Sequence, residues 1–218
     1  MVSVLVIADA PRPGECNRGL EPLLGPESCA RLQEALIRRA VAWAQAIAPD
    51  ATFVACHPLD AVGDFATLVP AGVTITGYAG ADAGERATGA AQAVFARAGR
   101  PLLVIGTSMP WLAPYHARAA AEDLAEGCDV SFGVATGGGL YLLAMARPQP
   151  RLLQLAGETH NGEMTRRVSR QIAEELGLSV GMLHYERALD RPHDAYAMAA
   201  DPMLPRQISE ILRFARPA

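Results

Sequence analysis

Arginines, hydroxyls and carboxylates collect in the loops that directly follow apolar, strand-forming runs of the sequence. Arg12 and Arg18 lie in the loop after the first apolar run, where guanidinium groups could grip a phosphate. Ser108 and Asp190 follow two later runs of the same kind. Ligands of open α/β sheets bind beyond the carboxyl ends of the strands, so these loops are the first places to look for a functional site.

Two alternatives account for the first loop, which begins Pro11-Arg12-Pro13-Gly14 and reaches Arg18. In the functional alternative, proline stiffens the loop, Gly14 lets the backbone approach a ligand, and the arginines bind phosphate. In the other, the loop is a rigid connection whose arginines are solvated. The sequence lacks the glycine patterns of dinucleotide-binding loops and P-loops here, so spacing alone favours the rigid connection.

Two acidic residues stand where a helix is expected to begin. Asp82 could accept a hydrogen bond as the helix N-cap, and Glu85, three residues later, would complete a capping box. Two interpretations account for these acids equally well. In one they cap the helix, and in the other this turn closes over a ligand.

The composition excludes several kinds of chemistry. All 19 basic residues are arginine, because the sequence contains no lysine. A Schiff-base lysine, a Walker-A lysine and a lysine general base are therefore impossible, and an anion site must use arginine, backbone N–H groups or a metal. The formal net charge of −4 and the lack of a basic block argue against nucleic-acid binding.

Several features are typical of globular cytoplasmic proteins. The 218 residues are 50% hydrophobic and 19% charged, which suits a large core. The four cysteines form no C-x-x-C pair, the first residues lack the charged region of a signal peptide, and no apolar stretch is long enough to span a membrane. We expect a cytoplasmic protein with reduced thiols. The sequence is also compatible with a homodimer that forms through an apolar helix face.

Short apolar runs alternate with longer helical patterns along the chain. Strands are expected at residues 2–8, 51–56, 73–76, 101–105, 130–134, 140–145 and 178–184. Helices are expected at residues 26–48, 85–98, 113–126, 162–176 and 207–214. The alternation predicts a single α/β domain over residues 1–218, with a mixed, mainly parallel sheet between helices on both faces.

Taken in order, the loop motifs resemble a bacterial glycosyltransferase-like family associated with arsenosugar biosynthesis and with radical-SAM and selenium-domain genes. The resemblance runs from about residue 4 to residue 195. The family motif A-K-x-P-x-P-G-x-x-K-T-R-L-x-P-x-L-G corresponds to residues 8–25, and G-D-L-G-E-R-M corresponds to residues 81–87. Its motifs G-T-D-S-P, D-G-G-Y-Y-L and D-x-D-T-P-E-D-L correspond to residues 106–110, 137–142 and 188–195.

The resemblance implies a GT-A-like, three-layer α/β/α sandwich, as in nucleotide-diphospho-sugar transferases. It implies catalytic roles for Asp190, Asp82 and Glu85, with Asp190 as the remaining ligand of a Mg²⁺ or Mn²⁺ ion. Ser108 stands where the family has a metal-binding aspartate, and a neutral hydroxyl is a poor sole anchor for such an ion. The implied contacts to a nucleotide or nucleotide-sugar are Pro11, Arg12, Pro13, Gly14, Arg18, Arg86, Thr107, Ser108, Gly138 and Gly139.

Two functions are compatible with these residues. The first is transfer of a sugar or nucleotidyl group from a nucleotide-activated donor, as the resemblance implies. The second is a catalytically degenerate relative that binds a ligand or a partner. Asp9, Asn17 and Gly19 stand where the family has basic residues. Each lost charge-assisted contact to a diphosphate would cost about 1.5–3 kcal/mol, unless neighbouring arginines compensate.

Overall fold

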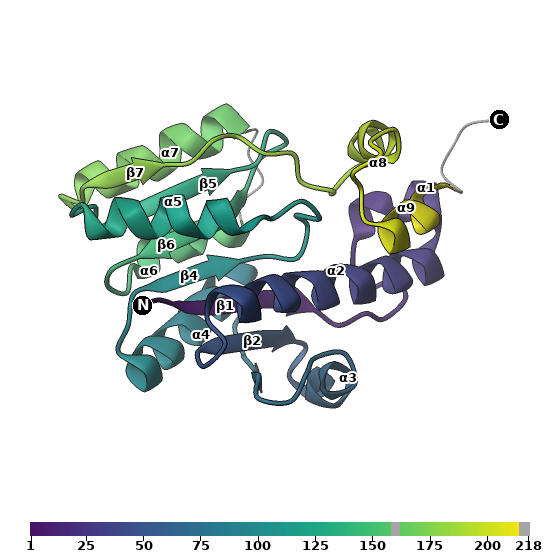
Figure 1. Cartoon of the computed structure of the whole chain (residues 1–218), viewed down its shortest axis with the longest axis horizontal. Coiled ribbons are helices and arrows are strands. Elements are labelled where there is room, and N and C mark those ends of the chain that lie inside the picture. Colours follow the sequence, from purple (N-terminus) through teal and green to yellow (C-terminus); the bar gives the residue numbers. More distant parts are fainter. Residues whose placement is uncertain (158–161, 214–218) are drawn as a thin grey trace.

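The computed structural model describes residues 1–157 and 162–213. Its middle layer is a seven-stranded sheet in the order β3-β2-β1-β4-β6-β5-β7 (Figure 1). The strands are β1 (Ser3–Asp9), β2 (Thr52–His57), β3 (Thr74–Gly77), β4 (Leu102–Ile105), β5 (Val130–Val134), β6 (Leu140–Met145) and β7 (Val180–Met182). Neighbouring strands are parallel except at β6, which runs antiparallel to both β4 and β5. The predicted mixed, mainly parallel sheet is confirmed.

Helices cover both faces of the sheet. The α-helices are α1 (Glu21–Leu24), α2 (Pro26–Ile47), α3 (Val62–Ala66), α4 (Ala83–Ala98), α5 (Pro114–Ala125), α6 (Pro150–Leu153), α7 (Gly162–Glu175), α8 (Pro192–Ala199) and α9 (Arg206–Leu212). Helices α2 and α5 contact each other over one face, whereas α4, α6 and α7 form a contiguous group on the other (Figure 1). The predicted three-layer α/β/α sandwich is therefore confirmed.

The central strands form because their side chains are apolar on both faces. In β1, Val4, Leu5 and Val6 have no exposed surface, which a parallel strand between two helical layers requires. Helix α2 begins with Pro26, whose fixed φ and missing N–H suit the first helical position. The buried face of α2 packs on β1, so this helix fixes the loop that joins them.

A second apolar cluster lies beyond the carboxyl end of the sheet, where α8 and α9 pack against α2 and the 3₁₀ turn Arg18–Leu20 (Figure 1). The sequence predicts only a polar loop at residues 185–194, but α8 begins within it. Asp194 starts this helix by accepting hydrogen bonds from the Arg191 N–H at 3.1 Å and from Arg187 at 3.1 Å. Two turns of helix carry too weak a periodic signal to be recognised in sequence.

Among the described helices, none combines the length and the apolar character needed to cross a membrane. The cytoplasmic location, the single-domain organisation and the homodimer stay predictions. The last residue of the helix predicted at 207–214 lies outside the described residues, and the helix itself is α9.

Close packing between β5 and β6 yields a test of the sheet. A Cβ atom added at Gly133 would overlap the ring of Tyr141, which lies against this glycine. We expect Gly133→Ala to lower the free energy of unfolding by about 1–3 kcal/mol, because the ring must leave its place. Urea unfolding measures the change, and Gly137→Ala, where a Cβ meets open space, is the matched control. Equal stability of the two variants would contradict the packing described.

Candidate functional site

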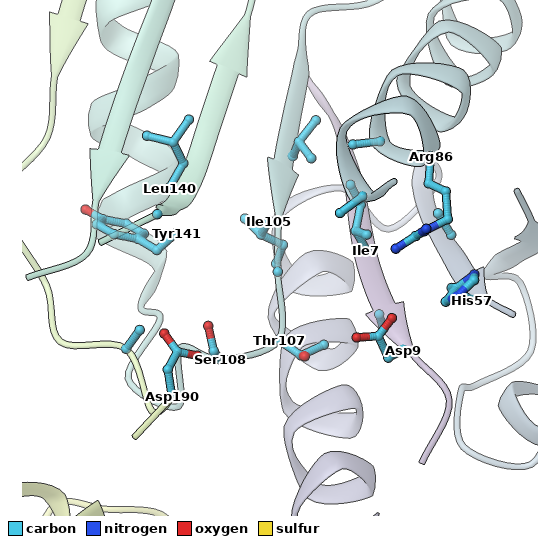
Figure 2. Close-up of a pocket in the computed structure, with 18 of the residues that line it drawn as sticks. Ile7, Asp9, His57, Arg86, Ile105, Thr107, Ser108, Leu140, Tyr141 and Asp190 are labelled. Atoms are coloured by element: carbon cyan, nitrogen blue, oxygen red, sulfur yellow. The ribbon is translucent and has the colours of Figure 1, made fainter. Parts of the chain in front are cut away.

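A pocket of about 500 Å³ opens at the carboxyl ends of β1, β2 and β4 (Figure 2). It lies where the strand order reverses between β1 and β4, which is the usual ligand position in open α/β sheets. Its polar lining residues are Asp9, Asn17, Arg18, Gln33, His57, Arg86, Thr107, Ser108 and Asp190. The loops that follow β1, β4 and β7 supply most of them.

The side chain of Gln33, buried on α2, joins three of the segments that form the pocket. Its amide nitrogen donates to the carbonyl of Asp9 at 2.9 Å and lies 3.4 Å from the Thr107 hydroxyl. Its amide oxygen accepts from the Asn17 side chain at 3.1 Å. One amide group therefore links the ends of β1 and β4 to the loop that precedes α1.

Asp190 is held at the pocket by contacts on both sides of it. The N–H of Leu189, which is buried in the second apolar cluster, donates to the Ser108 carbonyl at 2.8 Å. The Ser108 side chain lies beside Asp190 (Figure 2) and lowers the pKa of its carboxyl. Gly19 packs so closely on the Asp190 carbonyl that no larger residue fits there without movement. Three loops that are distant in sequence thus meet at this carboxylate.

Asp190 is exposed at the pocket mouth, but protein packs around its carboxyl on the side away from solvent. This burial raises its pKa above the ordinary value of 3.8, and the nearby Asp194 raises it further. The hydrogen bond from Ser108 and the charge of Arg191 oppose the shift without cancelling it. Asp190 is therefore a better proton acceptor than a freely solvated aspartate.

The opposite wall carries a mixed group of charges from β1, β2 and α4. Figure 2 shows Asp9, His57 and Arg86 along this wall, away from Asp190 and Ser108. Burial raises the pKa of Asp9, while His57, Arg86 and Arg18 act in the other direction. Because two arginines and a histidine face a single carboxylate, this wall is the part of the pocket suited to an anion.

Seven of the residues expected at a site lie together in the pocket: Arg18, Arg86, Thr107, Ser108, Gly138, Gly139 and Asp190. Gly138 and Gly139 do not offer free backbone donors. The Gly138 N–H donates to the Ala135 carbonyl at 3.0 Å, and the Gly139 N–H donates to the Thr165 hydroxyl at 3.2 Å. The two glycines therefore provide space for a ligand rather than hydrogen bonds to it.

Other expected contacts lie outside the pocket lining. Pro11, Arg12, Pro13 and Gly14 belong to the loop after β1, but they do not line the pocket. Arg12 instead forms ion pairs with Asp64 at 2.8 Å and with Asp60 at 3.4 Å. These pairs hold the loop against the segment around α3.

Asp82 and Glu85 are engaged at the start of α4. The Asp82 side chain accepts from the Glu85 N–H at 2.8 Å, and the Glu85 carboxylate accepts from the Ala81 N–H at 2.8 Å. Both acids thus cap the start of α4, and neither lines the pocket. Their catalytic role stays a prediction without a contact that supports it.

Several pocket residues were not anticipated as site residues from the sequence, chiefly Gln33, His57 and Tyr141. For Asp9, the sequence indicates only that it stands where the family has a lysine. Asp9 and His57 are the last residues of β1 and β2 and pair with each other in the parallel register. The rule that ligands bind at the carboxyl ends of strands could have found both. Gln33 carries no such signal, because it looks like any other polar residue of a helix.

The oxygen donors of the pocket do not fit a divalent ion held by the protein alone. Over residues 1–157 and 162–213, no group of three or more His, Cys, Asp or Glu side chains comes together in a way that could hold a metal. Asp190 has only the Ser108 hydroxyl beside it, and Asp9 belongs to the opposite wall (Figure 2). Mg²⁺ and Mn²⁺ prefer several oxygen ligands, which these two side chains do not supply.

Residues 29–156 match the family described as "Uncharacterized protein conserved in bacteria (DUF2064)". The chain belongs to this family. The matched region includes α2, the ends of β2 and β4, and β6, so it covers much of the pocket. No curated protein matches the chain.

Several solved structures share the fold. A candidate nucleotide-diphospho-sugar transferase from Desulfovibrio desulfuricans G20 is 21% identical, with a TM-score of 0.75 over 97% of this chain and 94% of that one. Rv0371C from Mycobacterium tuberculosis H37Rv, in complex with manganese, is 13% identical, with a TM-score of 0.53 over 97% and 98%. CMP:2-keto-3-deoxy-manno-octonic acid synthetase, in complex with CTP, is 12% identical, with a TM-score of 0.50 over 90% and 95%. These likenesses establish the nucleotide-diphospho-sugar transferase fold for this chain.

The raised pKa of Asp190 predicts how stability depends on pH. The folded protein holds this proton more tightly than the unfolded chain, so folding loses stability as the pH rises from about 3.8 through the raised value. Asp190→Asn removes this loss, because an amide of nearly the same shape does not ionise. We expect the variant to gain stability relative to the wild type as the pH rises from about 4 to 7. Thermal unfolding across this range measures the difference, and a difference that does not change with pH would contradict the assignment.

The Gln33 linkage can be tested in the same way. Gln33→Leu removes the donor to the Asp9 carbonyl and one of the two acceptors of the Asn17 amide, which keeps its bond to the Cys29 carbonyl at 3.1 Å. We expect a loss of about 1–3 kcal/mol in unfolding free energy. Gln171→Leu is the control, because Gln171 bonds only an exposed glutamate of its own helix, at 3.1 Å. Urea unfolding of both variants should separate them, and similar losses would argue against the linkage.

Proposed function

We propose that this protein binds a nucleotide-activated donor and transfers a sugar or nucleotidyl group from it to an acceptor. One observation carries the proposal. A pocket of about 500 Å³ at the carboxyl ends of β1, β2 and β4 is lined by Arg18, Arg86 and Asp190, and Arg86 lies on the side away from the Asp190 carboxylate (Figure 2). The relatives in fold support it, since one is a transferase candidate and another holds CTP.

The donor's phosphates would lie against the cationic wall. Arg18 and Arg86 are the arginines that line the pocket, and guanidinium groups form strong paired hydrogen bonds with phosphate oxygens. Thr107 at the end of β4 would add a hydroxyl donor. Asp9 lies on the same wall and would repel a phosphate when ionised, so the arginines must outweigh it.

Asp190 would act on the acceptor. Its raised pKa suits a group that accepts a proton from a hydroxyl at neutral pH. In the proposed step, the acceptor oxygen forms a bond to the sugar carbon or to the phosphorus of the donor. The bond to the nucleoside diphosphate or pyrophosphate breaks, its electrons leave with that group, and Asp190 takes the hydroxyl proton. No metal ion enters this step.

We further propose that the chain lies in the branch of glycosyltransferase-like proteins associated with arsenosugar biosynthesis and radical-SAM and selenium-domain genes. The order of its loop motifs supports this affiliation. The donor-binding roles of Arg12 and Gly14 stay predictions, because Arg12 is paired with Asp64 and Asp60.

A second function is a degenerate relative that binds a ligand or partner without turnover. The pocket's ligand chemistry favours it, because within residues 1–157 and 162–213 no group of three or more His, Cys, Asp or Glu side chains could hold a metal ion. Under this alternative, the pocket binds nucleotide poorly whether or not a metal ion is added.

Calorimetric titration with CTP, GTP and UDP-glucose, each with and without Mn²⁺, separates the two functions. We expect at least one nucleotide to bind, and Arg86→Leu to weaken that binding about 10- to 100-fold through the loss of charge-assisted contacts. Arg97→Leu is the control, because Arg97 lies on the same helix but stacks on Phe53 outside the pocket. If no nucleotide binds under any condition, transfer fails and the degenerate alternative gains support.

A further inference from the structure

Most charged groups of the pocket interact with one another around Asp9. Apart from Asp190, the charged or histidine lining residues are Asp9, Arg18, His57 and Arg86, and the last three all act on the Asp9 carboxyl. Figure 2 shows three of these residues along the β1 and β2 side of the pocket, whereas Leu140 and Tyr141 occupy the other side. The pocket therefore has a charged half and an apolar half.

The apolar half is built from the start of β6. Its lining residues are Leu140, Tyr141 and Leu143. No arginine or histidine of the lining belongs to this half. The Tyr141 hydroxyl is already used, because it donates to the His184 carbonyl at 2.9 Å. This half can therefore make apolar contacts with a ligand. It has no positive charge that could replace the water around an anion.

The border of the apolar half carries two polar side chains. Ser108 and Asp190 lie next to one another below Leu140 and Tyr141 in Figure 2. A carboxylate accepts hydrogen bonds from a hydroxyl and repels another carboxylate or a phosphate. The chemistry of this border therefore selects a neutral alcohol over an anion.

We propose that the apolar half is the acceptor subsite, and that it takes a neutral, hydroxyl-bearing molecule whose apolar body packs on Leu140 and Tyr141 while its hydroxyl meets Asp190. The identification as an acceptor subsite rests on the proposed transferase function. The chemistry of the ligand rests on the pocket alone. Acceptors with a phosphate or carboxylate next to the reacting hydroxyl are excluded by the same contacts.

A matched pair of fluorescent probes tests this chemistry. 2-Naphthalenemethanol is a neutral alcohol with an aromatic body, and 2-naphthoate replaces its hydroxymethyl group with a carboxylate. Both are titrated into the full-length protein in the presence of excess inorganic pyrophosphate, which competes for the arginines of the charged half. We expect the alcohol to bind about tenfold or more tightly than the carboxylate, because the apolar half cannot compensate a buried charge.

A charge added to the apolar half should reverse this preference. Leu140 is half-buried at the first position of β6, so Leu140→Arg adds a guanidinium at the rim of the subsite. We expect the variant to lose affinity for the alcohol and to gain affinity for the carboxylate, each by about tenfold. Leu176→Arg is the control, because Leu176 lies at the end of α7 outside the pocket and is 37% exposed.

The outcomes for the subsite and for the transferase function are separate. The subsite chemistry is overturned if the alcohol does not bind, if pyrophosphate displaces it, or if the wild type binds the carboxylate as tightly. The comparison of the two probes on the wild type stands even if Leu140→Arg fails to fold. Failure of every nucleotide to bind, with the probe preference intact, would remove the transferase function and leave a pocket for a neutral alcohol.

Discussion

The pocket depends on one buried amide. The Gln33 side chain, carried by α2, binds the end of β1, the end of β4 and the loop at Asn17. An amide has both donors and acceptors, so it can satisfy a carbonyl, a hydroxyl and another amide at once. A charged or apolar side chain at this position would leave some of these buried groups unpaired, which costs more than the net stability that a hydrogen bond contributes.

A second constraint brings the remaining wall to the pocket. Residues 185–191 reach the site because α8 and α9 bury their apolar faces on α2 and anchor Leu189 there. The Leu189 N–H then binds the Ser108 carbonyl, so Asp190 lies against the loop that follows β4. The position of Asp190 is thus set by hydrophobic burial some distance away, and its raised pKa follows from the walls that this burial brings together.

The pocket combines opposite chemical tendencies. Arginines favour an anion on the β1 and β2 side, while the start of β6 offers only hydrocarbon. Such a division suits a reaction between a charged donor and an uncharged acceptor. The arginines would bind the charged donor, and the apolar half would bind the uncharged acceptor. In the proposed function, Arg18 and Arg86 would neutralise the phosphates of the donor. The absence of lysine from the sequence leaves arginine as the long cationic side chain available for this role.

The sequence by itself determined the strands, the long helices and the edge of the sheet at which the pocket opens, because these depend on local apolar periodicity and on the direction of parallel strands. It also left the correct alternative open at Asp82 and Glu85, whose capping contacts lie within four residues. Only the tertiary structure decided that Arg12 is bound by Asp60 and Asp64, that Gln33 joins three segments, and that a short helix α8 anchors Asp190. Those contacts join residues that are tens of positions apart, and a single sequence carries no local pattern for them.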